Sequence, residues 1–288
     1  MKKIISMALV AVMMLAACFG LTSCGNNEII VQTNAFFAPF EYYDGTEIKG
    51  VDVEIMALVG EKMGKDVKFE NVEFAAIIDN VAAGKVCDCG AAGITITDER
   101  KEKVDFSTPY YTSVQYVIYA KNDASVQTKT VDGNTYIVWE ALAGKTLGTQ
   151  TDTTGWIYTD GEINAQESND YGYDGVLYNT NTKLKNFDNA QLAADGIKSN
   201  IVDVVIIDEL PAKYIVDKNT DLTCVPLYYS GATDAKDAPV EEQYAICVTK
   251  VNDKLLKAIN EVLADLMKKD ENGKTEVDKL VMKHMNLD

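Results

Sequence analysis

Apolar and polar positions along residues 29–285 follow two periodicities. Short β-branched or alternating runs predict strands, and longer segments with apolar residues three or four positions apart predict helices. The predicted strands are 29–33, 67–72, 90–95, 110–120, 145–149, 202–207 and 242–249. The clearest predicted helices are 53–63, 77–83, 253–269 and 275–285. Strands that alternate with helices are typical of a largely parallel sheet between helix layers, so the predicted fold class is α/β.

The predicted elements form two series, which indicates two lobes. Residues 24–112 hold the first series and residues 113–242 hold the second. If the chain crosses near 110–114 and returns near 240–244, the final helices rejoin the first lobe. We therefore predict a lobe 1 made of 24–112 and 243–288, a lobe 2 between them, and a hinge of two crossings.

The N-terminal segment has the order of an export signal. Lys2 and Lys3 precede an apolar run that is too short for an ordinary membrane span, and small residues follow it. A buried N-terminal helix is the alternative. Leu-Thr-Ser before Cys24 resembles the lipobox of bacterial lipoproteins. We therefore expect a signal peptide over 1–23, lipidation of Cys24, and an extracytoplasmic protein anchored to the cell membrane.

Composition and charge narrow the possible functions. The chain has 44 Asp plus Glu against 27 Lys plus Arg, and its net charge is −17. Nucleic-acid binding relies on clustered basic residues, so nucleic acid is not an expected partner. With His284 as the single histidine, neither a histidine-based metal centre nor a Ser-His-Asp triad is expected. We therefore predict no metal, no cofactor and no catalytic residue.

Four cysteines remain after residue 24. Two of them, Cys87 and Cys89, form a Cys-x-Cys pair, but no second such pair and no His cluster completes a zinc site. Buried free thiols are the favoured interpretation. A disulfide such as Cys224 to Cys247 and a metal site are the alternatives. The four are Cys87, Cys89, Cys224 and Cys247.

The only arginine of the chain, Arg100, stands in an unusual place. Thr97 reads as a helix N-cap, which puts Arg100 at about the third position of that helix. A cation there is unfavourable by about 0.3–1 kcal/mol unless an anion binds at the same spot. The guanidinium, free backbone N–H groups and the Thr95 hydroxyl together describe a carboxylate site, which phosphate also fits. The alternative is an ion pair with a neighbouring acid on the surface.

The second lobe offers complementary groups at two strand ends. Thr153 and Thr154 follow the strand 145–149 and supply hydroxyls and backbone amides, although an ordinary helix cap explains them equally well. Asp208 ends an apolar strand, where burial is unfavourable without a cation or hydrogen bonds. A helix N-cap is its alternative role. Arg100 on one lobe and Asp208 on the other describe a receptor for a zwitterion, of which an α-amino acid is the smallest common example.

Four segments resemble the bacterial extracellular solute-binding proteins of the polar-amino-acid type, which deliver ligands to ABC importers. They are 50–55, 92–101, 104–111 and 203–209, and the resemblance covers nearly all of 29–270. It implies the two-lobed, type II periplasmic-binding-protein fold. It also implies an ABC permease as partner, closure of the hinge around an amino acid, and a protein that is a monomer and not an enzyme.

The resemblance assigns roles by position. It implies that Arg100 binds the α-carboxylate together with the backbone of Thr95 and Thr154. The carbonyl of Gly93, the Thr95 hydroxyl and Asp208 then hold the α-ammonium. The positions that match the side-chain pocket are Asn34, Phe37, Phe74 and Gln150. Neutral amides beside aromatic rings favour a polar uncharged amino acid.

Some alternatives stay open. Asp152 stands where the family commonly has glycine, and its charge leaves room for a cationic ligand. The segment 156–187 is longer than usual and has no assigned role. A sensor that partners with a signalling protein would bind the same ligand. A cyclohexadienyl-dehydratase-like enzyme would need an acid in the pocket, for which Glu73 or Asp152 are the candidates.

Overall fold

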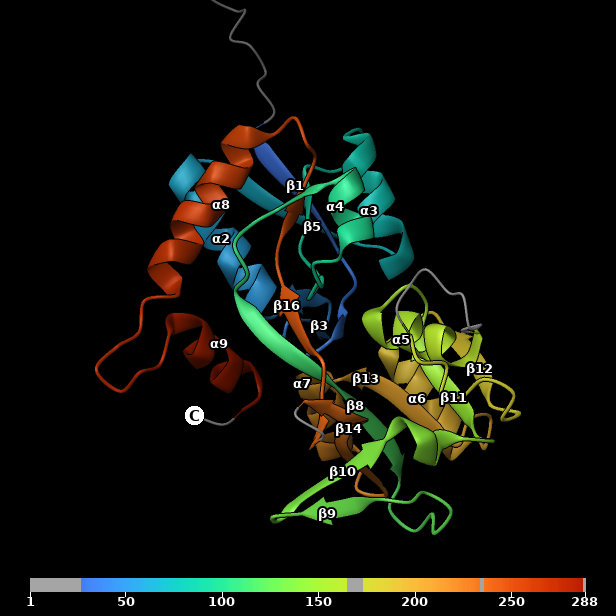
Figure 1. The fold of residues 1–288 in the computed structure, drawn as a ribbon. Helices are drawn as coiled ribbons and strands as arrows, with labels where there is room; N and C mark the ends of the chain where they lie inside the picture. Colours follow the sequence, from blue (N-terminus) through green and yellow to red (C-terminus); the bar gives the residue numbers. More distant parts are fainter. Residues whose placement is uncertain (1–26, 165–172, 234–235, 287–288) are drawn as a thin grey trace, which may run out of the picture.

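The computed structural model describes residues 27–164, 173–233 and 236–286, and in them the chain builds two α/β lobes joined by two strands (Figure 1). The predicted signal peptide over 1–23 and the proposed lipid site Cys24 lie outside the described residues. No helix of the described residues is long and apolar enough to cross a membrane.

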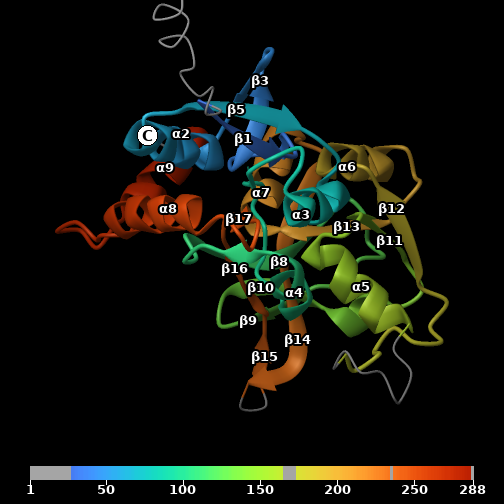
Figure 2. The same cartoon turned by 90° about the horizontal axis from the view of Figure 1, so that it is seen from above.

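Lobe 1 is a five-stranded sheet with the order β5-β1-β6-β17-β7. Its strands are β1 (Glu28–Thr33), β5 (Asp66–Asn71), β6 (Cys89–Gly90), β7 (Asp105–Phe106) and β17 (Cys247–Val248). Its helices are α2 (Val51–Met63), α3 (Phe74–Ala83), α4 (Asp98–Lys103), α8 (Asp253–Leu266) and α9 (Glu276–His284). Figure 2 shows α8 and α9 on the same side of lobe 1 as α2, which both helices contact. The last helices of the chain thus complete the first lobe.

The lobe 1 sheet is mixed, which corrects the prediction of a largely parallel sheet. β1 pairs in parallel with β5 and β6, whereas β17 runs antiparallel to β6 and β7 because it enters after the return crossing. The strand predicted over 90–95 is also wrong in extent, since β6 ends at Gly90. Gly93 takes a φ of 53°, which turns the backbone out of the sheet.

Lobe 2 is a larger mixed sheet with the order β12-β11-β13-β8-β14-β10-β9. Its strands are β8 (Tyr111–Ala120), β9 (Lys129–Val131), β10 (Asn134–Val138), β11 (Thr146–Gln150), β12 (Lys183–Phe187), β13 (Val204–Asp208), β14 (Leu222–Thr233) and β15 (Lys236–Ala238). Its helices are η1 (Trp139–Leu142), α5 (Thr154–Asn164), α6 (Ala190–Lys198) and α7 (Glu209–Lys218). Parallel pairing of β11 with β12 and β13 brings the carboxyl ends of these strands to one edge.

The two crossing strands are hydrogen-bonded to each other. β16 (Glu241–Tyr244) pairs antiparallel with the first residues of β8, so that Val114 faces Glu241 and Tyr111 faces Tyr244. Both strands run through the middle of the molecule between the lobes (Figure 1). A paired ladder of this kind gives the hinge a defined geometry.

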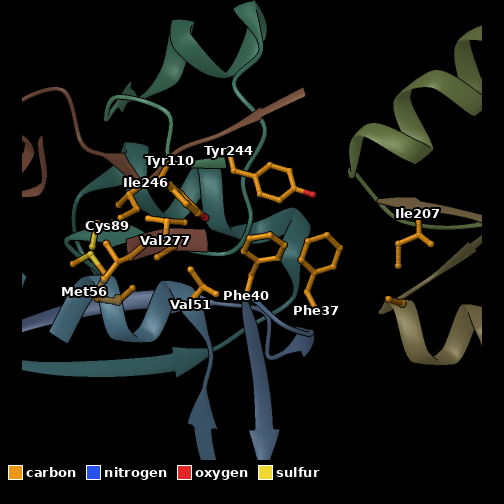
Figure 3. Close-up of a cluster of buried hydrophobic side chains, with 14 of the residues drawn as sticks. Phe37, Phe40, Val51, Met56, Cys89, Tyr110, Ile207, Tyr244, Ile246 and Val277 are labelled. Carbon is orange, nitrogen blue, oxygen red and sulfur yellow. The ribbon is translucent and has the colours of Figure 1, made fainter. Parts of the chain in front are cut away.

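The core of lobe 1 reaches the hinge through aromatic rings. Phe40 and Tyr244 are fully buried and meet edge to face with centroids 5.0 Å apart. Figure 3 shows these rings beside Phe37, with Ile207 of β13 on the facing lobe. A short sheet of β2 (Phe36–Phe37), β3 (Glu41–Asp44) and β4 (Glu47–Lys49) carries Phe37 to this place.

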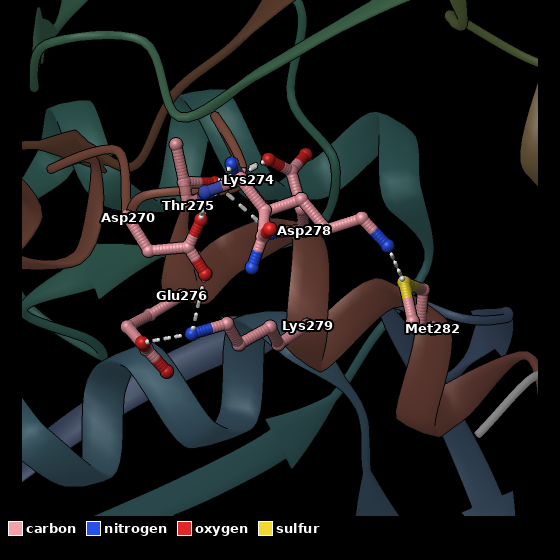
Figure 4. A network of polar contacts seen from close by, with 8 residues as sticks. Asp270, Lys274, Thr275, Glu276, Asp278, Lys279 and Met282 are labelled. Atoms are coloured by element: carbon pink, nitrogen blue, oxygen red, sulfur yellow. Dashed lines mark hydrogen bonds and ion pairs between the residues drawn. The ribbon is translucent and has the colours of Figure 1, made fainter.

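Helix α9 is fixed at both ends. At its start Thr275 and Asp278 form a capping box, within a polar network that includes Asp270 and Lys279 (Figure 4). At its end the His284 ring lies 2.6 Å from the Glu54 carboxylate of α2. These contacts tie the C-terminus to lobe 1.

Candidate functional site

A pocket between the two lobes collects all nine of the sequence-predicted site residues. Residues from both lobes form its wall. The wall is formed by Asn34, Phe37, Glu41, Phe74, Ala92, Gly93, Thr95, Arg100, Gln150, Thr153, Thr154 and Asp208. The roles assigned to the predicted residues stay predictions, but their gathering in one place is a property of the fold.

Arg100 is held in the pocket wall by hydrogen bonds to both lobes. Thr97 caps α4 by accepting from the backbone N–H of Arg100 at 3.2 Å, which places Arg100 in the first helical turn. Its Nη1 donates to the carbonyl of Thr95 and its Nη2 to the carbonyl of Asp152, each at 2.7 Å. The guanidinium also lies 5.5 Å from the ring centroid of Phe74. Both hydrogen-bond partners are neutral, so neither compensates the cation, and burial lowers the pKa of Arg100.

Asp208 lies on the facing lobe at the end of β13 and is 3% exposed. Its Oδ1 accepts a 2.6 Å hydrogen bond from the Tyr244 hydroxyl. The residue occupies the N-cap position of α7, but its side chain makes no capping hydrogen bond. Burial raises the pKa of this carboxyl. The alternative role as a helix cap is therefore not supported, and the acid is free to face the pocket.

Glu242 is a site residue that sequence analysis missed. It lies on β16 and is 2% exposed. Its Oε2 accepts hydrogen bonds from the Thr95 hydroxyl at 3.1 Å and the Thr154 hydroxyl at 2.5 Å, and its Oε1 accepts from the Gln115 amide at 2.9 Å. Burial and the nearby charge of Asp208 raise the pKa of Glu242 to about 8.

Glu41 is a second acid that sequence analysis missed. Its side chain is fully buried, faces the pocket, and has no donor among the described residues within hydrogen-bond reach of either carboxylate oxygen. Asp52 stands beside it and accepts from the Tyr110 hydroxyl at 2.6 Å and from the Gly93 N–H at 3.0 Å. Burial and the Asp52 carboxyl hold the pKa of Glu41 well above its usual range. The pKa of Asp52 rises to about 6 because it is buried too.

The predicted side-chain pocket is closed by contacts across the lobes. The side-chain amide of Gln150 donates to the Asn34 side-chain oxygen, Oδ1, at 3.0 Å. The Asn34 side chain in turn donates from Nδ2 to the backbone carbonyl of Val72 at 2.7 Å. The Phe37 ring lies so near Gly93 that a Cβ at that position would approach it to 2.8 Å. Glycine is therefore required at 93 by both space and backbone angle.

The structure also bears on the predictions for Asp152 and for the cysteines. Asp152 takes a φ of 61°, a conformation that glycine adopts at no steric cost, and it offers Arg100 its backbone carbonyl. Cys87, Cys89, Cys224 and Cys247 are free thiols and no disulfide joins Cys224 to Cys247; three of the thiols are buried as expected, whereas Cys224 is only half-buried. No cluster of metal-ligating side chains occurs within the described ranges.

A cation on one lobe and a buried acid on the other, facing one pocket beside a two-stranded hinge, define a two-lobed receptor for a small zwitterion. The chain belongs to the bacterial extracellular solute-binding proteins, family 3, which it matches over residues 29–279. The family places the protein outside the cytoplasm.

Several relatives are named as amino-acid-binding proteins. The chain is 28% identical over 275 residues to the arginine-binding extracellular protein ArtP of Bacillus subtilis, covering 92% of this chain and 93% of that one. It is 27% identical to a probable histidine-binding protein of Campylobacter jejuni, covering 77% and 80%. Among solved structures, AbpA of Streptococcus pneumoniae bound to L-arginine has a TM-score of 0.72 at 26% identity, covering 92% and 97%. The protein is thus an amino-acid-binding component of an ABC transporter.

Proposed function

We propose that the pocket binds an L-amino acid with its α-carboxylate on Arg100 and its α-ammonium beside Asp208. The observation that carries this proposal is the placement of these two buried residues, one from each lobe, in the wall of one pocket. Arginine pairs with a carboxylate through two parallel hydrogen bonds, and an ammonium would compensate a carboxylate that is otherwise costly to bury. The Gly93 carbonyl and the Thr95 hydroxyl line the same wall and would complete the ammonium site.

The acids of the pocket favour a ligand with a cationic side chain. Glu41 lines the pocket without a cationic partner among the described residues, since the group beside its carboxyl is the Asp52 carboxyl, while the side-chain amides of Asn34 and Gln150 already bond to each other. Without a cation Glu41 keeps a proton, and a bound guanidinium or ammonium would replace it. The names of ArtP and AbpA point the same way. The second candidate is a polar uncharged amino acid, which rests on the same Asn34 and Gln150 amides lining the pocket.

Capture works by closure of the hinge. Arg100 of lobe 1 reaches the Asp152 carbonyl of lobe 2, and the Gln150 side chain reaches that of Asn34, so residues of the pocket wall themselves join the two lobes. A ligand that bridges Arg100 and Asp208 stabilises this closed form, which would be the form that an ABC permease receives. We propose that the protein acts as a monomer, catalyses no reaction, and is anchored by lipid on Cys24.

A thermal-shift screen of the twenty amino acids tests the ligand. A ligand at 100 times its Kd stabilises the folded protein by about 2.7 kcal/mol, which is readily seen as a raised Tm. We expect the largest shift from L-arginine or L-lysine. The largest shift from L-glutamine or L-asparagine would support the uncharged candidate, and no shift from any amino acid would contradict the proposal.

Incorporation of labelled palmitate tests the anchor. We expect the full chain to take up label in bacterial cells and to fractionate with membranes. The variant Cys24→Ser should remain unlabelled. Equal labelling of both proteins would contradict lipidation at Cys24.

A further inference from the structure

A buried acid on the second crossing strand stands behind the wall of the ligand pocket. Glu242 points to the same side of β16 as Tyr244, since both are buried while Glu241 and Gln243, which alternate with them, are exposed. Thr95 and Thr154 line the pocket in front of it. Glu242 therefore acts on a ligand through these two threonines.

The carboxylate of Glu242 joins its own strand, β16, to three other parts of the molecule. Its Oε2 accepts from Thr95 of lobe 1 and from Thr154, which opens α5 of lobe 2. Its Oε1 accepts from Gln115, which lies on β8, the first crossing strand. Opening the lobes would separate Thr95 from Thr154, whose hydroxyl oxygens lie 3.4 Å apart, so Glu242 could not keep both bonds. The double contact belongs to the closed form alone.

These bonds also fix what the threonines offer to a ligand. A hydroxyl has one proton to donate and two lone pairs to accept with. Since both threonines donate their proton to Glu242, their hydroxyls can present only lone pairs to the pocket. Lone pairs bind an ammonium and repel a carboxylate. The donors left for a carboxylate are then the Arg100 guanidinium and backbone N–H groups, which divides the pocket into an accepting half and a donating half.

We propose that Glu242 is a closure latch. It is a positioning residue that stabilises the closed form through Thr95 and Thr154 and orients both hydroxyls to accept from the α-ammonium of the ligand. This inference rests on the proposed amino-acid site for its second part, whereas the first part concerns the lobes alone.

The charges around Glu242 agree with such a role. The titratable groups that interact electrostatically with it are the Asp208 carboxyl, the Tyr244, Tyr158 and Tyr173 hydroxyls and the Arg100 guanidinium. Asp208 is the nearest acid that opposes its ionisation. A ligand ammonium between Asp208 and the threonines would favour the ionised carboxylate, which is the better acceptor. Ligand binding and latching would therefore strengthen each other.

Two substitutions at one position test the latch. Glu242→Leu keeps the bulk of the side chain and removes both acceptors. Glu242→Gln keeps one acceptor oxygen for the threonines, and its NH2 can donate to the Gln115 amide oxygen, which has no partner. Glu241→Leu, on the exposed neighbour, is the matched control. L-arginine and L-glutamine serve as probes in calorimetry, and small-angle X-ray scattering with and without L-arginine reports closure.

We expect Glu242→Leu to weaken binding of the amino acid that the wild type binds by about 10- to 100-fold and to enlarge the radius of gyration. Glu242→Gln should restore most of the lost affinity, which a loss of charge alone would not allow. Unchanged affinity and radius in Glu242→Leu would overturn the latch, as would an equal loss in both variants. If Glu242→Leu does not fold, Thr154→Val removes the lobe 2 half of the bridge and should weaken binding about 10-fold, and unchanged binding there overturns the latch.

The same measurements separate this inference from the proposed function. If the wild type binds neither probe, the amino-acid site fails in its proposed form. The radius of the ligand-free variants then still decides the latch, because closure requires no ligand identity. A wild type that binds L-arginine beside a Glu242→Leu variant that binds it equally well would leave the site intact and refute the latch.

Discussion

The two ends of the pocket are built in opposite ways. At the donating end one cation, Arg100, uses two of its N–H donors on the carbonyls of Thr95 and Asp152, and its remaining donors are available to a ligand. At the accepting end three buried acids, Asp208, Glu41 and Glu242, share the space with no basic side chain among the pocket-wall residues on their side. Within the described part of the chain, the first end holds a cation with no acid hydrogen-bonded to it, and the second end holds acids with no base hydrogen-bonded to them.

The difference between the two ends shows which buried groups a ligand would have to compensate. Burying a charge without a partner is so unfavourable that an acid takes up a proton instead. The raised pKa values of Asp208, Glu41 and Glu242 follow from this rule. A ligand with positive groups can replace these protons. Under the proposed function, the donating end would select for a carboxylate and the accepting end for the positive groups of the ligand.

The largest effect is expected at the donating end. Arg100→Ala should weaken amino-acid binding by about 3–5 kcal/mol, because the ligand carboxylate and Asp208 would be left poorly compensated in a buried site. Titration calorimetry measures it, with Lys101→Ala on the exposed side of the same helix as the control. Unchanged binding in Arg100→Ala would show that the carboxylate lies elsewhere.

A smaller and selective effect is expected from Glu41. Glu41→Gln should weaken the binding of L-arginine by about 1.5–3 kcal/mol, the range for a hydrogen bond to a charged group. The binding of L-glutamine should change little. Competition between the two ligands measures the ratio directly. An equal loss for both ligands would mean that Glu41 supports the fold of the pocket and does not read the ligand side chain.

The acids also predict a dependence on pH. Glu242, with its pKa raised to about 8, holds a proton in the ligand-free protein at neutral pH. A bound ammonium favours the ionised form, so binding releases a proton, and affinity should rise with pH up to about 8 and then level off. The slope is at most about tenfold per pH unit for one proton. Calorimetry in two buffers of different ionisation enthalpy counts the released protons, and affinity that is constant from pH 6 to 8 would refute the exchange.

The smallest effect is expected far from both ends. Thr275→Ala removes the capping box of α9 and should lower the free energy of unfolding by about 1 kcal/mol. Ligand affinity should stay the same, because α9 packs on α2 and lies outside the pocket wall. Urea unfolding and calorimetry together show whether stability and binding separate. A parallel loss of affinity would mean that the pocket effects above include a general loss of structure.

The sequence could predict the donating end because its residues stand in regular local patterns. Thr97, Asp98, Glu99 and Arg100 are consecutive, and a helix start can be recognised from such a run. The alternation of apolar and polar residues predicted the main strands and helices for the same reason. The prediction of a strand over 90–95 failed because the backbone turns at one glycine, Gly93. The Phe37 ring packs against this glycine and Asp52 accepts its N–H, and both contacts come from distant segments.

The accepting end could not be predicted so well, because its acids come from distant segments. Glu242 follows another glutamate, and such a pair reads as a solvated surface. One local signal did exist: Tyr244 is two positions away, and alternate residues of a strand share a face, so a buried Tyr244 brings Glu242 inward. For Glu41 no comparable signal exists. Its burial follows from the packing of β3 against α2 and the core, and only the fold shows it.

The discontinuity of lobe 1 has a consequence for how the chain folds. Lobe 2 is one continuous stretch, whereas the lobe 1 sheet needs β17, and α2 needs α8 and α9, all from the last part of the chain. Contacts so far apart in sequence form slowly, because a long loop must close first. During synthesis the N-terminal lobe therefore cannot finish until the final helix emerges. Until then β6 lacks its partner β17 and α2 lacks its partners α8 and α9, so the early segments of lobe 1 wait for the end of the chain.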